Sequence, residues 1–516
     1  MTPELMGAAE AVRALRAGNV SAVEMTAACL RAIERFEPDV LAWEIVEPAA
    51  ALATAADVDR RLAQGDEVGP LAGVPIGVKD IFNTIDMPTQ MGSPIWAGFT
   101  PGNDSRVVHY LRQAGAVVAG KTVTAEFAVH TPGKTLNPHD PRYMTGTSSS
   151  GSAAATAAYM VPLALGTQTA GSIIRPASYC GVYGFKPSFG LVARTGMLKT
   201  TDSLDTIGGF ARCAEDLRLL FDVIRVHGED YPIAHTALRD PSRQEKGDRP
   251  WRLGLVTGPT WDLAEAYAQE ALFDLADNLA DAGISLEEVD LPAEMFRAHE
   301  VHATIYDKAL AYYFREEFTR HTLVSPIMYE IVERGNRITA AEYTAALTEQ
   351  ERIAARFDTL LAGGPDALIT LSTGGEPLFG VHSVDRPDSC LVWTLCGAPT
   401  ISIPAFTGPG SLPFGLQLVG RRYGDYLLLD LARHLENIGV APRATYPAPP
   451  MTSAGRRPSA IGHPATTVVS RLSATLGGGR ASQLRWAGRP RCRGRGTGRA
   501  QAGDLTERAP VPAGAR

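Results

Sequence analysis

A short run of small and polar residues, QTAGSIIRP at 168–176, contains a serine at a point where neither helix nor strand is favoured. A serine hydroxyl is a weak nucleophile until a neighbouring base removes its proton. A tight turn at Thr169, Ala170, Gly171 and Ser172 would also present backbone N–H groups able to stabilise an oxyanion. The run is therefore predicted to be an oxyanion turn that carries a nucleophile, Ser172.

A second serine cluster and a lysine further upstream could complete this chemistry. Ser148 lies in TGTSSSG, and Lys79 follows the apolar stretch of GVPIGVKD. Burial lowers the pKa of a lysine, and a neutral lysine can serve as a general base. With Ser148 as a proton relay, Ser172 could then attack a carbonyl without a histidine or a metal ion. The alternative from composition alone is that the Gly/Ser-rich segments are linkers and Lys79 is a solvated charge.

The elements that must position these residues alternate between helix-like and strand-like patterns. Helical spacing of apolar residues covers 8–36, 105–115, 264–283, 296–320 and 339–362, whereas 71–80, 116–122, 161–166, 251–256, 284–291 and 399–405 are typical of strands. Such alternation predicts an α/β fold with helices on both faces of one sheet.

One match to a phosphate-binding loop is interpreted as chance. GAVVAGKT at residues 115–122 fits GxxxxGK[ST]. That motif needs free backbone N–H groups between its glycines, but AVVA is itself strand-like, so these groups are expected to bond within a sheet. The sequence also lacks G-x-S-x-G and H-E-x-x-H patterns, so neither an α/β-hydrolase nor a metallohydrolase is indicated. We expect no metal and no cofactor.

Composition separates a folded part from a basic tail. Residues 451–516 contain twelve arginines and only two acidic residues, although the whole chain has a net charge of −7. We predict a catalytic domain at residues 1–446 and an Arg/Gly/Pro-rich, disordered tail at 447–516. An RNA-binding arm is the alternative for this tail, but it lacks regular RG repeats and interleaved aromatic residues. The six scattered cysteines indicate buried thiols.

The start of the chain and its hydropathy predict a cytoplasmic location. Acidic residues at Glu4 and Glu10 do not fit a secretory signal, and no apolar run is long enough to span a membrane. We expect no membrane partner and no nucleic-acid partner. The oligomeric state stays open, with a homodimer among the options.

Several segments together resemble the amidase signature family. They are GVPIGVKD, NPHDPRYMTGTSSSGSAAA, GTQTAGSIIRPASYCGVYGFKPSFG and, near the end, WTLCGAPTISIPA with LPFGLQLVG, so the resemblance spans about residues 3–446. Membership implies one α/β domain around a large mixed β-sheet flanked by helices on both faces. It also implies a Ser-Ser-Lys triad, whose matching positions are Ser172 as nucleophile, Ser148 as bridging serine and Lys79 as base.

Departures from the family pattern bear on the substrate. The common nucleophile loop is TDxGGS, whereas here it reads TQTAGS, so Ala170 replaces a glycine and requires a conformation that alanine can adopt. Thr147 stands where glycine is usual, and we place it with Arg175 in the substrate-binding region. Arg175 follows the nucleophile by three residues, a spacing that resembles amidases of small acidic amides. Arg175 has two possible roles. It could bind a substrate carboxylate through a bidentate contact, or it could be a structural anchor paired with a core carbonyl or acid.

The sequence therefore predicts an amidase that hydrolyses a small-molecule carboxylic amide, in one version a carboxylate-bearing one, through an acyl-enzyme. Two alternatives are an amidotransferase-type subunit, which is a glutaminase that requires partners, and a non-catalytic binding protein. Pocket residues outside the motifs are expected near 126–130, 302–330 and 373–383, with Tyr306 and Tyr329 as candidates.

Overall fold

A computed structural model describes residues 2–228, 236–383 and 385–440. The predicted disorder of the tail concerns residues outside these ranges. Five cysteines lie within them, and all five are buried and free, as the sequence indicated. Across the three described ranges, no helix is long and apolar enough to cross a membrane. The cytoplasmic location stays a prediction.

One mixed sheet of 11 strands organises the described chain, in the order β1-β3-β2-β4-β6-β5-β10-β11-β9-β7-β8. β2 is parallel to both β3 and β4, whereas β4, β6, β5, β10, β11 and β9 form a run of antiparallel pairs. The strands are β1 (Trp43–Val46), β2 (Pro75–Lys79), β3 (Val117–Thr122), β4 (Leu163–Gln168), β5 (Tyr183–Lys186), β6 (Thr206–Ala211), β7 (Arg252–Leu255), β8 (Ser285–Glu288), β9 (Ala367–Leu371), β10 (Thr400–Thr407) and β11 (Pro413–Gly420).

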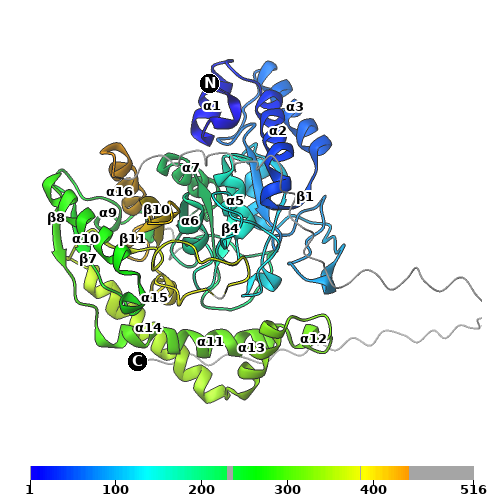
Figure 1. Cartoon of the computed structure of the whole chain (residues 1–516). Helices are drawn as coiled ribbons and strands as arrows, with labels where there is room; N and C mark the ends of the chain where they lie inside the picture. Colours follow the sequence, from blue (N-terminus) through cyan, green and yellow to red (C-terminus); the bar gives the residue numbers. More distant parts are fainter. Residues whose placement is uncertain (1, 229–235, 384, 441–516) are drawn as a thin grey trace, which may run out of the picture. The chain divides into compact units, whose positions relative to one another are not determined.

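Helices surround the sheet (Figure 1). They are α1 (Ala8–Arg16), α2 (Ala22–Val40), α3 (Pro48–Ala63), α4 (Arg106–Gln113), α5 (Ser150–Ala157), α6 (Ile174–Cys180), α7 (Ala214–Ile224), α9 (Pro241–Gln244), α10 (Ala266–Asp281), α11 (Ala298–Tyr313), α12 (Arg315–Phe318), α13 (Pro326–Arg337), α14 (Ala340–Leu361), α15 (Leu391–Leu395) and α16 (Asp425–Asn437).

The alternation of side chains along β4 shows that both faces of the sheet are covered. Leu163 and Leu165 belong to the hydrophobic cluster that includes α4 and α7. Ala164, between them, belongs to the cluster that includes α2 and α5. Successive side chains of a strand point to opposite faces, so helices pack on each side. The predicted mixed sheet with helices on both faces is confirmed.

The helical pattern at residues 8–36 proves to be two helices rather than one. Gly18 adopts a positive φ of 71° just after α1, which ends the first helix. Ser21 then caps α2, because its hydroxyl accepts from the N–H of Glu24 while the Glu24 carboxylate accepts from the N–H of Ser21. The serine–glutamate spacing was therefore the available signal for the break.

The phosphate-loop match at residues 115–122 lies in the sheet, as expected. Residues Val117–Thr122 form β3, which pairs with both β1 and β2. The motif lysine, Lys121, is completely buried and its Nζ lies 3.0 Å from the Asp80 carboxylate. It also donates to the carbonyl oxygens of Phe82 and Pro88. This lysine is a structural residue of the core.

Candidate active site

The last residue of β2, Lys79, is completely buried and surrounded by hydroxyl groups. Its Nζ lies 2.9 Å from Ser148 Oγ, 2.9 Å from Ser149 Oγ and 2.9 Å from Thr167 Oγ1. Parallel pairing of β2 with β4 brings Thr167 to this point, and the serines stand at the start of α5. The predicted neighbours Lys79 and Ser148 are therefore in direct contact.

Lys79 has the electrostatic environment of a base. Burial lowers the pKa of its ammonium well below the usual value, and the charge of Asp205 only partly opposes this shift. Among the described residues, no carboxylate forms an ion pair with Lys79, in contrast to Lys121 on the neighbouring strand. A neutral amine has two N–H groups and one lone pair, so one of the three surrounding hydroxyls must donate to Nζ. Lys79 can therefore accept a proton from a serine.

The turn between β4 and α6 carries Ser172, which is 7% exposed. The carbonyl oxygens of the three residues before Ser172 are all held by other groups. His302 Nε2 donates to the Thr169 carbonyl at 2.9 Å, Thr394 Oγ1 donates to the Ala170 carbonyl at 2.8 Å, and the Arg175 N–H donates to the Gly171 carbonyl at 2.9 Å.

The N–H groups of the same turn remain available. Within the described ranges, nothing accepts a hydrogen bond from the N–H of Ala170, Gly171 or Ser172. The next two N–H groups, of Ile173 and Ile174, are bound by Gln168 Oε1 at 2.8 and 2.9 Å. Fixed carbonyls with free donors are what a preorganised oxyanion site requires.

The unusual residues of this turn fit its geometry. Ala170 is not among the residues with positive φ, so the conformation suits alanine as expected. A side chain in place of the hydrogen of Gly171 would collide with the Asp388 carboxylate. Gln168, which departs from the TDxGGS pattern, accepts from the two N–H groups at the start of α6 and donates through Nε2 to Thr394 Oγ1 at 2.9 Å. The amide therefore links the helix start to the residue that holds the Ala170 carbonyl.

Thr394 offers a test of this link. Replacing it by valine keeps the shape but removes the hydroxyl, which leaves Gln168 Nε2 without its partner and the Ala170 carbonyl with only the 3.9 Å contact of Cys390 Sγ. We expect kcat to fall about tenfold or more, with a loss of about 1–3 kcal/mol in the free energy of unfolding. Thr394→Ser should retain most activity. Stability loss in Thr394→Val without any change in kcat would show that the link does not position the turn.

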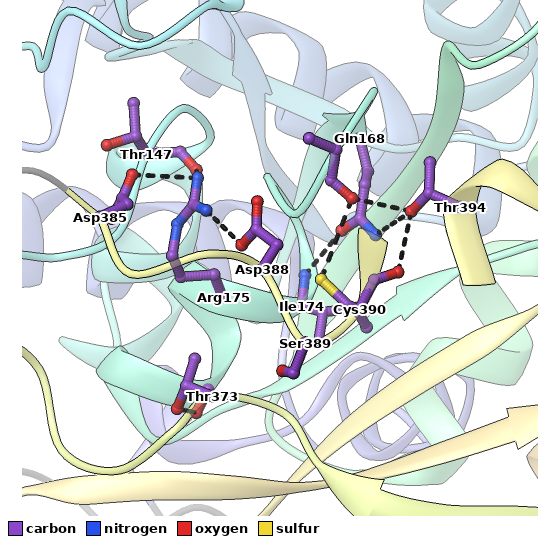
Figure 2. A network of polar contacts seen from close by, with 12 residues as sticks. Thr147, Gln168, Ile174, Arg175, Thr373, Asp385, Asp388, Ser389, Cys390 and Thr394 are labelled. Carbon is purple, nitrogen blue, oxygen red and sulfur yellow. Dashed lines mark hydrogen bonds and ion pairs between the residues drawn. The ribbon is translucent and has the colours of Figure 1, made fainter. Parts of the chain in front are cut away.

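Arg175 on α6 is enclosed by acidic groups (Figure 2). It is 3% exposed and forms ion pairs with Asp388 and, at 3.1 Å, with Asp385. Its Nη2 also donates to the Thr147 carbonyl at 2.5 Å, which ties the loop of Ser148 to the helix that follows Ser172. These contacts match the structural-anchor alternative, and a contact of Arg175 or Thr147 with substrate stays a prediction.

A cavity of about 460 Å³ lies beside the turn. Ala170 and Arg175, which flank Ser172 in sequence, belong to its lining, and α11 and α13 supply much of the rest. Tyr306 lines it as expected, but Tyr329 does not, because Tyr329 lies on α13 with its ring stacked on Phe318. Thr147 instead lines a smaller hollow together with Ser150 and Val381.

A family model described as Amidase matches residues 24–429. The chain belongs to the amidase family. The A-type subunit of the glutamyl-tRNA(Gln) amidotransferase of Chloroflexus aurantiacus is 34% identical over 455 residues, which cover 81% of this chain and 93% of that protein. The same subunit of Symbiobacterium thermophilum is 34% identical over 83% of this chain and 96% of its own.

Solved structures share the fold of this chain. Native peptide amidase from Stenotrophomonas maltophilia has a TM-score of 0.73 and 27% identity, covering 86% of this chain and 99% of that one. A structure from a study of a vestigial protein complex and the origins of an s-triazine catabolic enzyme has a TM-score of 0.76 and 28% identity, covering 85% and 100%. Members of this family act on C–N bonds as hydrolases or amidotransferases, so the chain is an enzyme, and the non-catalytic alternative is not retained.

Sequence reasoning missed several residues of this amidase site. Ser149 and Thr167 contact Lys79 as closely as Ser148 does. For Ser149 the available signal was the run of three serines, and Thr167 carried none. Asp385 and Asp388, the partners of Arg175, lie more than 200 residues further along the chain and carried no local signal. Thr394 was also missed, because nothing in WTLCGAP distinguishes its hydroxyl.

Proposed function

We propose that this enzyme hydrolyses a carboxylic amide through an acyl-enzyme on Ser172, with Ser148 as relay and Lys79 as base. The observation that carries the proposal is the buried Lys79 Nζ, which has no carboxylate partner among the described residues and lies 2.9 Å from Ser148 Oγ. The turn at residues 169–172, whose N–H donors at Ala170, Gly171 and Ser172 have no acceptor in the described chain, supports the same chemistry.

The reaction proceeds in two half-reactions. Ser172 Oγ attacks the carbonyl carbon while its proton passes through Ser148 Oγ to Lys79 Nζ, and the turn binds the oxyanion. The C–N bond then breaks, the leaving nitrogen takes the proton back through Ser148, and an ester on Ser172 remains. Water attacks this ester by the same relay, which releases the acid and restores Ser172.

An amidotransferase subunit is the second candidate, and the relatives favour it. Two relatives that match more than 80% of this chain are A-type subunits of glutamyl-tRNA(Gln) amidotransferases. In this version the same triad would release ammonia from an amide donor, and partner subunits would direct the ammonia to an acceptor. The TQTAGS loop, which departs from the common TDxGGS form, supports the independent hydrolase instead.

Ammonia release by the purified chain separates the two candidates. We expect steady release from simple aliphatic amides without any partner protein, measured by coupling ammonia to a glutamate dehydrogenase assay. The amidotransferase version predicts release from glutamine that becomes appreciable only after the other subunits of a bacterial glutamyl-tRNA(Gln) amidotransferase are added. If the chain releases ammonia only from glutamine, and only when those subunits are present, the hydrolase proposal would be overturned and the second candidate established.

A further inference from the structure

The cavity beside the oxyanion turn is lined by charged side chains of both signs. Its arginines are Arg175, Arg334 and Arg386, and its carboxylates are Asp307, Glu330, Asp385 and Asp388. They come from α6, α11, α13 and the segment that leads to α15. Because an arginine in such a position could bind a substrate carboxylate, the partners of each arginine decide what the cavity can accept.

Every one of these arginines already has a carboxylate partner from the chain. Arg334 holds Asp307 through two contacts, from Nε at 2.8 Å and from Nη2 at 3.2 Å. Arg386 Nη2 lies 2.7 Å from Glu265, which is outside the cavity lining. Arg175 has two carboxylate partners, Asp385 and Asp388 (Figure 2). No lining arginine is left as an uncompensated cation.

The other lining groups do not supply the missing positive charge. Burial lowers the pKa of His130 and that of His302 to about 4, so both rings are neutral at pH 7. His299 directs Nε2 to the Asp388 carbonyl oxygen at 3.1 Å, so this nitrogen is not free to bind a substrate carboxylate, and His382 is exposed to water, which screens a charge there. Glu330 has no ion-pair partner in the part of the chain that the structure describes, but it is exposed as well, so water screens its charge as it does at His382. The buried excess of charge is therefore negative, because Arg175 pairs with two aspartates.

We infer that this cavity selects amides that carry no carboxylate, and accepts neutral or cationic acyl groups. The inference rests on the proposed amide hydrolysis and specifies its substrate class. A substrate carboxylate would have to enter without a free cation or displace an aspartate from Arg175, which would leave that aspartate buried and unpaired. Built-in carboxylates that exclude a competing ligand are a recognised source of specificity. Of the two open roles for Arg175, this favours the structural anchor over the carboxylate clamp.

Three amides with four-carbon acyl chains test the inference through ammonia release. They are succinamate, which is anionic, butanamide, which is neutral, and 4-aminobutanamide, which is cationic. We expect kcat/KM for succinamate to be at least about tenfold below that for butanamide, and the value for 4-aminobutanamide to be no lower than that for butanamide. Succinamate turnover equal to or faster than butanamide turnover would overturn the inference.

Charge variants connect the preference to named residues. Asp385→Asn removes one partner of Arg175, and Glu330→Gln removes the acid that has no ion pair in the described chain. Asp385→Asn should raise the ratio of succinamate to butanamide activity at least about threefold, and Glu330→Gln, at an exposed position, should raise it less. Because the ratio is taken within one variant, partial loss of folded protein does not affect it. Glu34→Gln, at an exposed position on α2, should leave the ratio unchanged. An unchanged ratio in both cavity variants would show that these carboxylates do not set the preference, and would overturn the inference.

Labelling of Ser172 separates this inference from the proposed function. A fluorophosphonate that reacts with activated serines can be applied with each amide as competitor, so that occupancy is measured without turnover. Stronger protection by succinamate than by butanamide would overturn the inference even if no ammonia forms. Stronger protection by butanamide, together with no ammonia from any amide, would support the inference and count against the hydrolase proposal.

Discussion

Replacement of Ser172 by alanine is expected to lower kcat for amide hydrolysis by about 10⁴-fold or more. The variant keeps Lys79 and its hydroxyl neighbours but has no atom that can form the acyl bond. Residual activity would come only from binding and from the oxyanion turn. The direct readouts are ammonia release and intact mass, because the wild-type chain should gain the acyl mass of a slow substrate while Ser172→Ala should not.

A neighbouring serine provides the matched control for this variant. Ser150 is as buried as Ser172 and belongs to the same serine run as Ser148, but its hydroxyl contacts Thr135 rather than Lys79. Ser150→Ala should therefore keep kcat within a few-fold of the wild type. Ser172→Ala activity within tenfold of the wild type, with Ser150→Ala equally active, would mean that another group is the nucleophile.

Local patterns predicted most of the elements that carry the triad. Apolar runs bounded by glycine or proline located β2 and β4, and helical spacing located α4, α10, α11 and α14. Lys79 was placed at the end of a buried strand because the residues before it are apolar, and it is completely buried there. The pattern could not show that Thr167, near the end of β4, would also contact Lys79, because that contact depends on which strands pair.

The cavity was the part least visible in the sequence. The sequence does not decide whether Arg175 binds a substrate carboxylate or anchors the fold, because this depends on its partners. One of these partners, Asp388, is 213 residues away in the chain. Charge pairing across such a distance is set by the packing of α6 against the segment before α15, which no local periodicity records. Similarly, Tyr329 falls within the region 302–330 expected to line the pocket, yet on α13 the lining positions belong to Ile327, Glu330, Ile331 and Arg334.

Replacement of Lys79 by methionine is expected to lower kcat by about 10²- to 10⁴-fold at pH 8, the usual contribution of a general base. Methionine fills a similar apolar volume, so the three hydroxyls lose their proton acceptor without the introduction of a buried charge. Lys79→Arg should be at least as inactive, because a guanidinium stays protonated and cannot accept the Ser148 proton. Activity near wild type in either variant would exclude Lys79 as the base.

The pH profile of the wild type tests the same assignment independently. The folded chain lowers the pKa of Lys79 because burial disfavours its ammonium form, so the neutral base persists to lower pH than for an exposed lysine. As the pH falls through this lowered pKa, Nζ gains a proton, loses its lone pair and can no longer accept from Ser148. We therefore expect kcat/KM for butanamide to decline on acidification between pH 9 and 5, with folding followed by circular dichroism at each pH. A flat profile over this range, with the protein folded throughout, would mean that the base does not gain a proton between pH 9 and 5, which would contradict the assignment of Lys79.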